Sequence, residues 1–205
     1  INDYNIKNYG TGGYGTYQSL LKLEKILLKK NKIKYIIAVY TQAHEIRNIG
    51  EEAWLRTLSQ YSNRGHVYLP FATIDSQEKL KRHEPVKYIS LPLRENFAII
   101  NKIEKRIMKI IFYSKNRDPI KTTIKIFDEM NRIGKINKSK LIVLNMSGNL
   151  DEKYKVFFAK NNIPTIDCDL PSDDNLIIKG DGHPNKKAHT LYSECIFKKL
   201  VTLIE

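Results

Sequence analysis

Short apolar runs alternate with helical patterns along this chain. The runs at residues 31–40 (NKIKYIIAVY) and 138–146 (KSKLIVLNM) are rich in β-branched residues, which is typical of strands buried on both faces of a parallel sheet. Leucines at helical spacing predict a helix over residues 17–30. A second helical pattern, residues 151–162, separates the later run from the strand-like segment 164–170 and completes a βαβ unit. The alternation predicts an α/β protein built as a three-layer α/β/α sandwich with a mostly parallel sheet.

Residues 64–117 interrupt this alternation with two strand-like runs and a basic helix. We interpret them as an insertion or cap within one domain, because a chain of 205 residues suffices for a single core. The helix has an apolar face and an opposite basic face, which carry respectively Phe97, Ile100, Ile103, Ile107 and Ile110, and Lys102, Lys105, Arg106 and Lys109. The favoured interpretation is an amphipathic helix packed on the sheet. The alternative is a helix that lies on a membrane surface or binds an acidic partner.

The charge balance narrows the class of partner. A formal net charge of +13 and a pI near 9.6 favour anionic partners, but charge alone does not distinguish nucleic acid, anionic glycan and lipid headgroups. No motif combining aromatic and basic residues supports nucleic acid. No apolar run approaches the roughly 18 residues of a transmembrane helix. The chain starts at Ile1, so a preceding targeting segment, the compartment (bacterial envelope or cytoplasm) and the oligomeric state stay open.

The two cysteines, Cys168 and Cys195, form neither a C-x-x-C motif nor a zinc-like spacing. We therefore expect buried free thiols and no metal site. The chemistry predicted below requires no cofactor.

A glycine-rich stretch near the start raises a nucleotide-binding alternative. Gly10, Gly12 and Gly15 match G-x-G-x-x-G formally, and a helix follows. A dinucleotide-binding loop should follow a strongly apolar strand, whereas residues 1–9 are half polar. The first acidic residue after the second strand, Glu45, also comes about 30 positions later instead of about 20. A nucleotide-dependent Rossmann enzyme is therefore the weakest of three interpretations.

The C-terminal segment, residues 180–205, carries a more informative pattern. Pro184 and Asn185 suit the start of a helix whose apolar face predicts packing on the sheet. His183 is thus expected on a loop just before this last helix, at the edge of the sheet and beside Asp181. A histidine in such a place can act as a general base, with the carboxylate orienting its ring.

The ending DGHPN with its following helix, together with NYGTGGYGTYQ near the start, resembles the GDSL or SGNH hydrolase superfamily, which is named for its Ser, Gly, Asn and His blocks. The order of these motifs covers nearly the whole chain. The resemblance implies a flavodoxin-like α/β/α domain that transfers or cleaves acyl esters of carbohydrates or lipids. It also implies that the backbone N–H of Gly13 contributes to the oxyanion hole, that His183 is the general base, and that Asp181 is its partner.

The chain departs from the family pattern in its first block. The Gly-Asp-Ser block should precede Asn8, and no serine lies there. The nucleophilic serine is therefore expected upstream of residue 1, with Ser147 in NMSGN as an internal substitute whose place in the order does not match. Without a nucleophile, the chain is an inactive hydrolase-like module that binds an anionic glycan or nucleic acid.

The third block departs as well. His44 stands where the family has Asn, and Glu45 follows it. An imidazole N–H can donate to an oxyanion, so His44 can fill the same role; the alternative is a loop histidine bonded to Glu45. We expect Arg47 and Asn48 to brace the loop or, with Glu45, to contact the substrate.

The catalytic acid of the family commonly lies three residues before the histidine, where this chain has Gly180. Asp181 is one residue closer to His183. If its loop cannot bring it to the ring, a backbone carbonyl can orient the histidine, or one of three other carboxylates can replace it, namely Asp169, Asp173 or Asp174. The sequence as a whole predicts an ester hydrolase or acyltransferase, acting on a small-molecule ester, an acylated carbohydrate or an envelope polymer.

Overall fold

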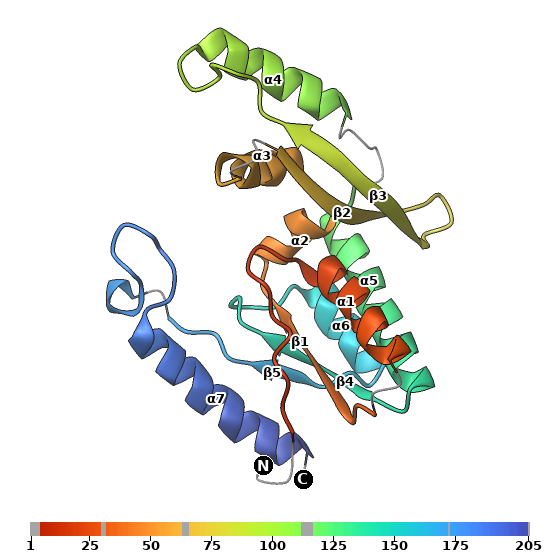
Figure 1. Ribbon diagram of the computed structural model, residues 1–205. Helices are drawn as coiled ribbons and strands as arrows, with labels where there is room; N and C mark the ends of the chain where they lie inside the picture. Colours follow the sequence, from red (N-terminus) through yellow and green to blue (C-terminus); the bar gives the residue numbers. More distant parts are fainter. Residues whose placement is uncertain (1–4, 30–31, 63–65, 112–116, 172, 205) are drawn as a thin grey trace. The chain divides into compact units, whose positions relative to one another are not determined.

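The protein divides into two compact units in a computed structural model that describes residues 5–29, 32–62, 66–111, 117–171 and 173–204 (Figure 1). The first unit comprises residues 1–11, 31–42 and 131–205, and the second comprises residues 12–30 and 43–130. Each unit has its own sheet, and the chain is a mixed α/β protein with parallel strands, as predicted.

The first unit contains a parallel sheet of strands β1 (Tyr35–Tyr40), β4 (Lys140–Asn145) and β5 (Thr165–Asp167), in the order β1-β4-β5. Helix α6 (Glu152–Lys160) connects β4 to β5. Its first turn is capped by Asp151, whose side chain accepts a hydrogen bond from the Lys153 N–H. The predicted βαβ unit is therefore confirmed.

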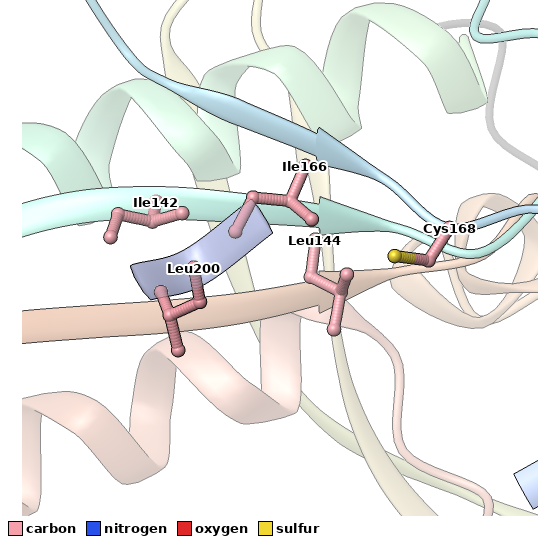
Figure 2. Close-up of a cluster of buried hydrophobic side chains, with 5 residues drawn as sticks. All are labelled: Ile142, Leu144, Ile166, Cys168 and Leu200. Atoms are coloured by element: carbon pink, nitrogen blue, oxygen red, sulfur yellow. The ribbon is translucent and has the colours of Figure 1, made fainter. Parts of the chain in front are cut away.

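Helices cover both faces of this sheet. Helix α7 (Lys186–Ile204) packs on one face, where a cluster of buried side chains joins strand and helix: Ile142, Leu144, Ile166, Cys168 and Leu200 (Figure 2). On the other face the ring of Tyr154 in α6 lies 5.1 Å from the ring of Tyr40 in β1. Each leucine and isoleucine of this cluster contributes roughly 1.5–3 kcal/mol through burial.

Strand β1 is less buried than the sequence predicts. Its side chains Ile37 and Val39 are 40% and 43% exposed. They lie on the same face of the sheet as the side chains of β4 and β5 that α7 covers. β1 is the edge strand of the sheet among the described residues, so the prediction of burial on both faces is correct for β4 and wrong for β1.

The two cysteines form a disulfide bond, so the expectation of free thiols is wrong. Cys168 directly follows β5, and Cys195 lies on the side of α7 that packs against the sheet. Packing of helix on strand brings their Cα atoms to 5.9 Å, a separation that a disulfide spans. The 27 positions between them in the sequence give no sign of this proximity.

The second unit consists of helices around an antiparallel pair of strands. Its elements are α1 (Thr16–Leu28), α2 (Ala43–Asn48), α3 (Glu52–Gln60), β2 (His66–Ile74), β3 (Leu80–Ile89), α4 (Ala98–Ile111) and most of α5 (Pro119–Ile136). A small core of Leu55, Tyr88 and Met108 joins α3, β3 and α4. The predicted insertion, residues 64–117, falls in this unit, although its residues 64, 65 and 112–116 lie outside the described part of the chain.

Helix α4 faces the core with a different side from the predicted one. Glu104 and Met108 point inward, whereas Ile103, Ile107 and Ile110 are exposed. The prediction that the isoleucine stripe packs on the sheet is therefore wrong. A carboxylate in the interior is costly unless it is paired and hydrogen-bonded, so this orientation of the helix depends on partners for Glu104.

Glu104 finds these partners around it. Its carboxylate accepts hydrogen bonds from Arg94 Nη1 at 2.7 Å, the Tyr88 hydroxyl at 3.0 Å and the Leu91 N–H at 2.6 Å. Burial, followed by the hydrogen bond to Glu104, raises the pKa of Tyr88 far above its usual value. The tyrosine therefore stays a neutral donor to the carboxylate.

Candidate functional site

The loop that carries His183 is fixed by backbone hydrogen bonds. The Ile178 N–H donates to the His183 carbonyl at 2.8 Å, and the Gly182 N–H donates to the Ile178 carbonyl at 3.0 Å. Gly180 and Gly182 have φ of +83° and +77°, values that favour glycine, so the tight return of the chain depends on both. The loop lies between the 3-10 turn η1 (Asp174–Leu176) and α7.

Asn185 anchors the same loop to the start of α7. Its side-chain Nδ2 donates to the Asn175 carbonyl at 2.8 Å, while its Oδ1 accepts from the Ala188 N–H. It thus has the contacts of a helix N-cap and also ties the η1 turn to the loop.

His183 and Asp181 form the pair that the sequence predicts. Nδ1 of His183 lies 2.7 Å from Oδ1 of Asp181, and both side chains are exposed. When Nδ1–H donates to the carboxylate, Nε2 is left with the lone pair that a general base needs. Of the carboxylates in the described ranges, Asp181 alone is bonded to this ring; Asp173 instead accepts from the Asn175 N–H.

The glycine turn precedes α1 in the second unit. Gly13 has a φ of +77°, and its N–H donates to no acceptor among the residues that the structure describes. The Gly15 N–H donates to Gln18 Oε1 at 2.7 Å. A Cβ atom at Gly15 would lie 2.6 Å from Asn48 Oδ1, so this position admits glycine alone without displacing α2. No strand precedes the turn in residues 5–15, unlike in a dinucleotide-binding loop.

Arg47 and Asn48 brace this turn from α2. Asn48 is fully buried, its Oδ1 accepts from the Tyr17 N–H at 2.8 Å, and its Nδ2 donates to Thr123 Oγ1. Arg47 Nη1 donates to the Tyr14 carbonyl at 3.1 Å, and its guanidinium lies 4.4 Å from the centre of the Trp54 ring. Both residues thus hold the turn through hydrogen bonds, which is one of the two roles expected for them. The substrate contacts of Glu45, Arg47 and Asn48 stay predictions.

His44 is partly buried beside the same turn. Desolvation, with a further contribution from the Arg47 charge, lowers its pKa to about 4. Its Nδ1 lies 3.4 Å from Thr16 Oγ1. A neutral ring that accepts from this hydroxyl carries its proton on Nε2, which is then a donor without a net charge.

The predicted residues fall into two groups. Gly13 and the predicted residues of α2, from His44 to Asn48, belong to the second unit. Asp181 and His183 belong to the first. Ser147 also lies in the first unit, two residues after β4, where its Oγ accepts from the Gln42 N–H at 2.6 Å.

Sequence reasoning missed a polar pair at the carboxyl ends of the strands. Asn145, at the end of β4, is fully buried, and its Nδ2 donates to Asp167 Oδ1 at 2.8 Å and to the Gly148 carbonyl. Asn145 and Asp167 each stand at the end of an apolar run in the sequence. Because the carboxyl ends of parallel strands meet at one edge of a sheet, this placement could have predicted the pair. No cluster of metal-ligating side chains occurs in the described ranges.

Comparisons with protein-family models, with curated proteins and with solved structures find no match. The resemblance to SGNH hydrolases therefore rests on the two sequence motifs.

Proposed function

We propose that the protein is an ester hydrolase or acyltransferase of SGNH type, with a flavodoxin-like three-layer domain. The observation that carries the proposal is the 2.7 Å contact between His183 Nδ1 and Asp181 Oδ1, on a loop that leads into the last helix. The parallel sheet with helices on both faces supports the fold part of the proposal.

In the proposed reaction a serine hydroxyl attacks the ester carbonyl while His183 Nε2 takes its proton. Asp181 holds the ring in the required tautomer and stabilises the imidazolium that forms. The Gly13 N–H and Nε2–H of His44, which both belong to the second unit, are the donors that we propose for an oxyanion. His183 then returns the proton to the leaving alcohol, and water or a second alcohol accepts the acyl group.

The low pKa of His44 supports its role as a neutral donor. At pH 7 a ring with a pKa of about 4 carries no charge, so the proposed hole does not depend on a titrating group near neutral pH. A fixed dipole in a buried place can stabilise a developing negative charge without reorganisation.

An acylated, anionic carbohydrate or envelope polymer is the proposed substrate class. The net charge of +13 supports an anionic substrate. The disulfide supports a place of action outside the reducing cytoplasm, where such polymers occur. Salt should accordingly weaken substrate binding, and unchanged binding between low and high salt would count against this substrate class.

The nucleophile is the expected upstream serine. The outer edge of β1 supports a further strand, because no strand pairs with it in the described part of the chain and its side chains Ile37 and Val39 are partly exposed. A first strand that ends in the nucleophile would lie there, next to the carboxyl ends of β1 and β4.

The test is p-nitrophenyl acetate hydrolysis by this chain and by a longer gene product that includes upstream residues. We expect activity in the longer product, a loss of 10²–10⁴-fold in His183→Ala and in Asp181→Asn, and no loss in His189→Ala, which removes an exposed histidine of α7. Activity unaffected by His183→Ala would refute the proposed base. Ser147→Ala tests the internal substitute in the same assay.

The alternative, an inactive module that binds an anionic glycan, makes the opposite prediction. All versions would then be inactive toward short and long acyl esters, while salt-dependent retention on a heparin column would persist in His183→Ala.

A further inference from the structure

Helix α4 exposes a continuous line of isoleucines. Ile99, Ile103, Ile107 and Ile110 follow one another at spacings of four, four and three residues, which places them on one face of a helix. Their exposed fractions are 65%, 48%, 43% and 72%. The helix contacts the rest of its unit with another side, that of Glu104 and Met108, so the isoleucine line belongs to no core formed by the described residues.

Further apolar side chains near both ends of the line are exposed. Leu93 and Phe97, just before the helix, are more than half exposed, as is Ile111 at its end. Folded proteins seldom expose contiguous apolar surface of this kind unless it binds something.

The remaining exposed side of α4 is cationic. Lys102, Lys105, Arg106 and Lys109 are all exposed and adjoin the isoleucine line. The single acidic residue of the helix, Glu104, is buried and paired with Arg94. The exposed surface of α4 therefore combines an apolar line with a positive flank and has no negative side chain.

We propose that α4 binds the surface of an anionic lipid bilayer. The helix lies in the plane of the interface, with the isoleucine line in the acyl boundary and the four cations among the headgroups. Its 14 residues span about 21 Å, enough for several lipids along its length. No helix in the described ranges is both long and apolar enough to cross a bilayer.

Charge favours a bilayer over a second copy of the chain as the occupant. Two copies joined through the isoleucine lines would bring their own cationic flanks together, and no acidic side chain on the exposed part of α4 would neutralise them. An anionic headgroup layer neutralises the flank and accepts the isoleucines at once. The proposal concerns residues outside the proposed ester site and stands without it.

The first experiment is flotation of the chain with vesicles of phosphatidylcholine alone or with 30% phosphatidylglycerol, at about 50 mM salt. We expect at least tenfold tighter binding to the anionic vesicles, and weaker binding as salt rises. Ile103→Asp with Ile107→Asp should weaken binding at least tenfold. The matched control, Val156→Asp with Phe197→Asp, replaces exposed apolar residues of α6 and α7 and should change it less than twofold.

A second pair of variants separates a specific surface from the overall charge. Lys102→Gln, Lys105→Gln and Lys109→Gln together should weaken binding to anionic vesicles at least tenfold. The matched triple variant on α6, Lys153→Gln, Lys155→Gln and Lys160→Gln, removes as much charge from exposed positions and should have a much smaller effect. Equal loss in both triple variants would overturn the proposal, because net charge alone would explain the binding.

A conservative probe keeps the proposal testable if the aspartate variants fail to fold. Ile103→Trp retains an apolar side chain, and its emission should shift to the blue on addition of anionic vesicles, beyond any change of Trp54 in the parent chain. No shift, or no flotation of the parent chain, would overturn the proposal. A dimer in light scattering that Ile103→Asp with Ile107→Asp dissociates would assign the surface to a second copy instead.

Discussion

His44 lies in a setting that keeps its imidazole neutral. Because the folded pKa is about 4 and the unfolded value is about 6.5, the unfolded chain binds more protons between these pH values. The stabilising effect of the neutral ring is therefore complete above pH 6.5 and is lost as the pH falls toward 4. The loss amounts to at most about 3 kcal/mol.

Urea unfolding followed by Trp54 fluorescence at pH 7, 6, 5 and 4.5 measures this effect. Trp54 is the single tryptophan of the chain and lies in the same unit as His44. The His44→Asn variant should have a shallower pH dependence than the parent chain, whereas His189→Asn on α7 should not. Titration of His44 near pH 6.5 by NMR would contradict the prediction.

At this scale, a contact between residues close in the sequence could be predicted, whereas a contact between distant residues could not. The proximity of Asp181 to His183 follows from their separation by two residues and from Gly182, which permits the tight return of the loop. The role of Gly15 is a different matter. Its close approach to Asn48 depends on α2, some 30 positions away, and no local pattern reveals which glycine of the turn has no room for a side chain.

At the scale of elements, the buried pair Glu104 and Arg94 sets how α4 attaches to its unit. Their side chains are 0% and 7% exposed. Glu104→Gln leaves the buried Arg94 without the negative charge beside it, and we expect the free energy of unfolding to fall by about 3–5 kcal/mol. Urea unfolding followed by Trp54 fluorescence measures it.

The matched control for this prediction is an exposed ion pair in the same unit. Lys121 contacts Glu78 at 3.2 Å with both side chains largely exposed, so Lys121→Gln should cost less than about 1 kcal/mol. Replacement of both members of the buried pair, Arg94→Met with Glu104→Leu, should recover part of the loss. A cost of Glu104→Gln no larger than that of Lys121→Gln would contradict the prediction.

Most helices and strands could be predicted from the periodicity of apolar residues, but the face that each turns toward the core could not. The helices and strands of the βαβ unit lie within a few residues of their predicted positions. For α4 the apolar stripe predicts the wrong inward face, because the residues that receive Glu104, among them Tyr88 and Arg94, precede the helix in the sequence and show no periodic relation to it.

At the scale of the whole molecule, the disulfide closes a loop that contains η1, the Asp181–His183 pair and the start of α7. Its two cysteines are 27 positions apart, for which chain entropy predicts a stabilisation of about 3–4 kcal/mol. Cys168→Ser with Cys195→Ser should therefore lower the stability of the first unit by roughly this amount.

Two probes on the same samples make this prediction specific. Circular dichroism reports helices of both units, whereas Trp54 fluorescence reports the second unit. In the serine double variant, the part of the circular dichroism transition that comes from the first unit should move to a lower urea concentration. The midpoint of the Trp54 fluorescence transition should change little. An equal shift of both midpoints would show that the two units unfold together.

The division into two units could not be predicted from the sequence, for a physical reason. The predicted insertion is marked by local composition, but the second unit also takes residues 12–30 and 43–63 from the regular alternation. Helix α1 has the same amphipathic pattern whichever unit its apolar face packs on, so periodicity alone does not assign it.

The parallel pairing of β1 with β4 has a consequence for synthesis. Tyr35 pairs with Lys140, about 100 residues later, so at 5–20 residues per second β1 waits about 5–20 s on the ribosome for its neighbour. The strand YIIAVY has no charged residue, and its Ile37 and Val39 remain partly exposed even in the folded sheet. During that interval the nascent chain presents an uncharged β-edge to other chains, so a ribosome-associated chaperone that covers β1 would prevent pairing with the wrong strand.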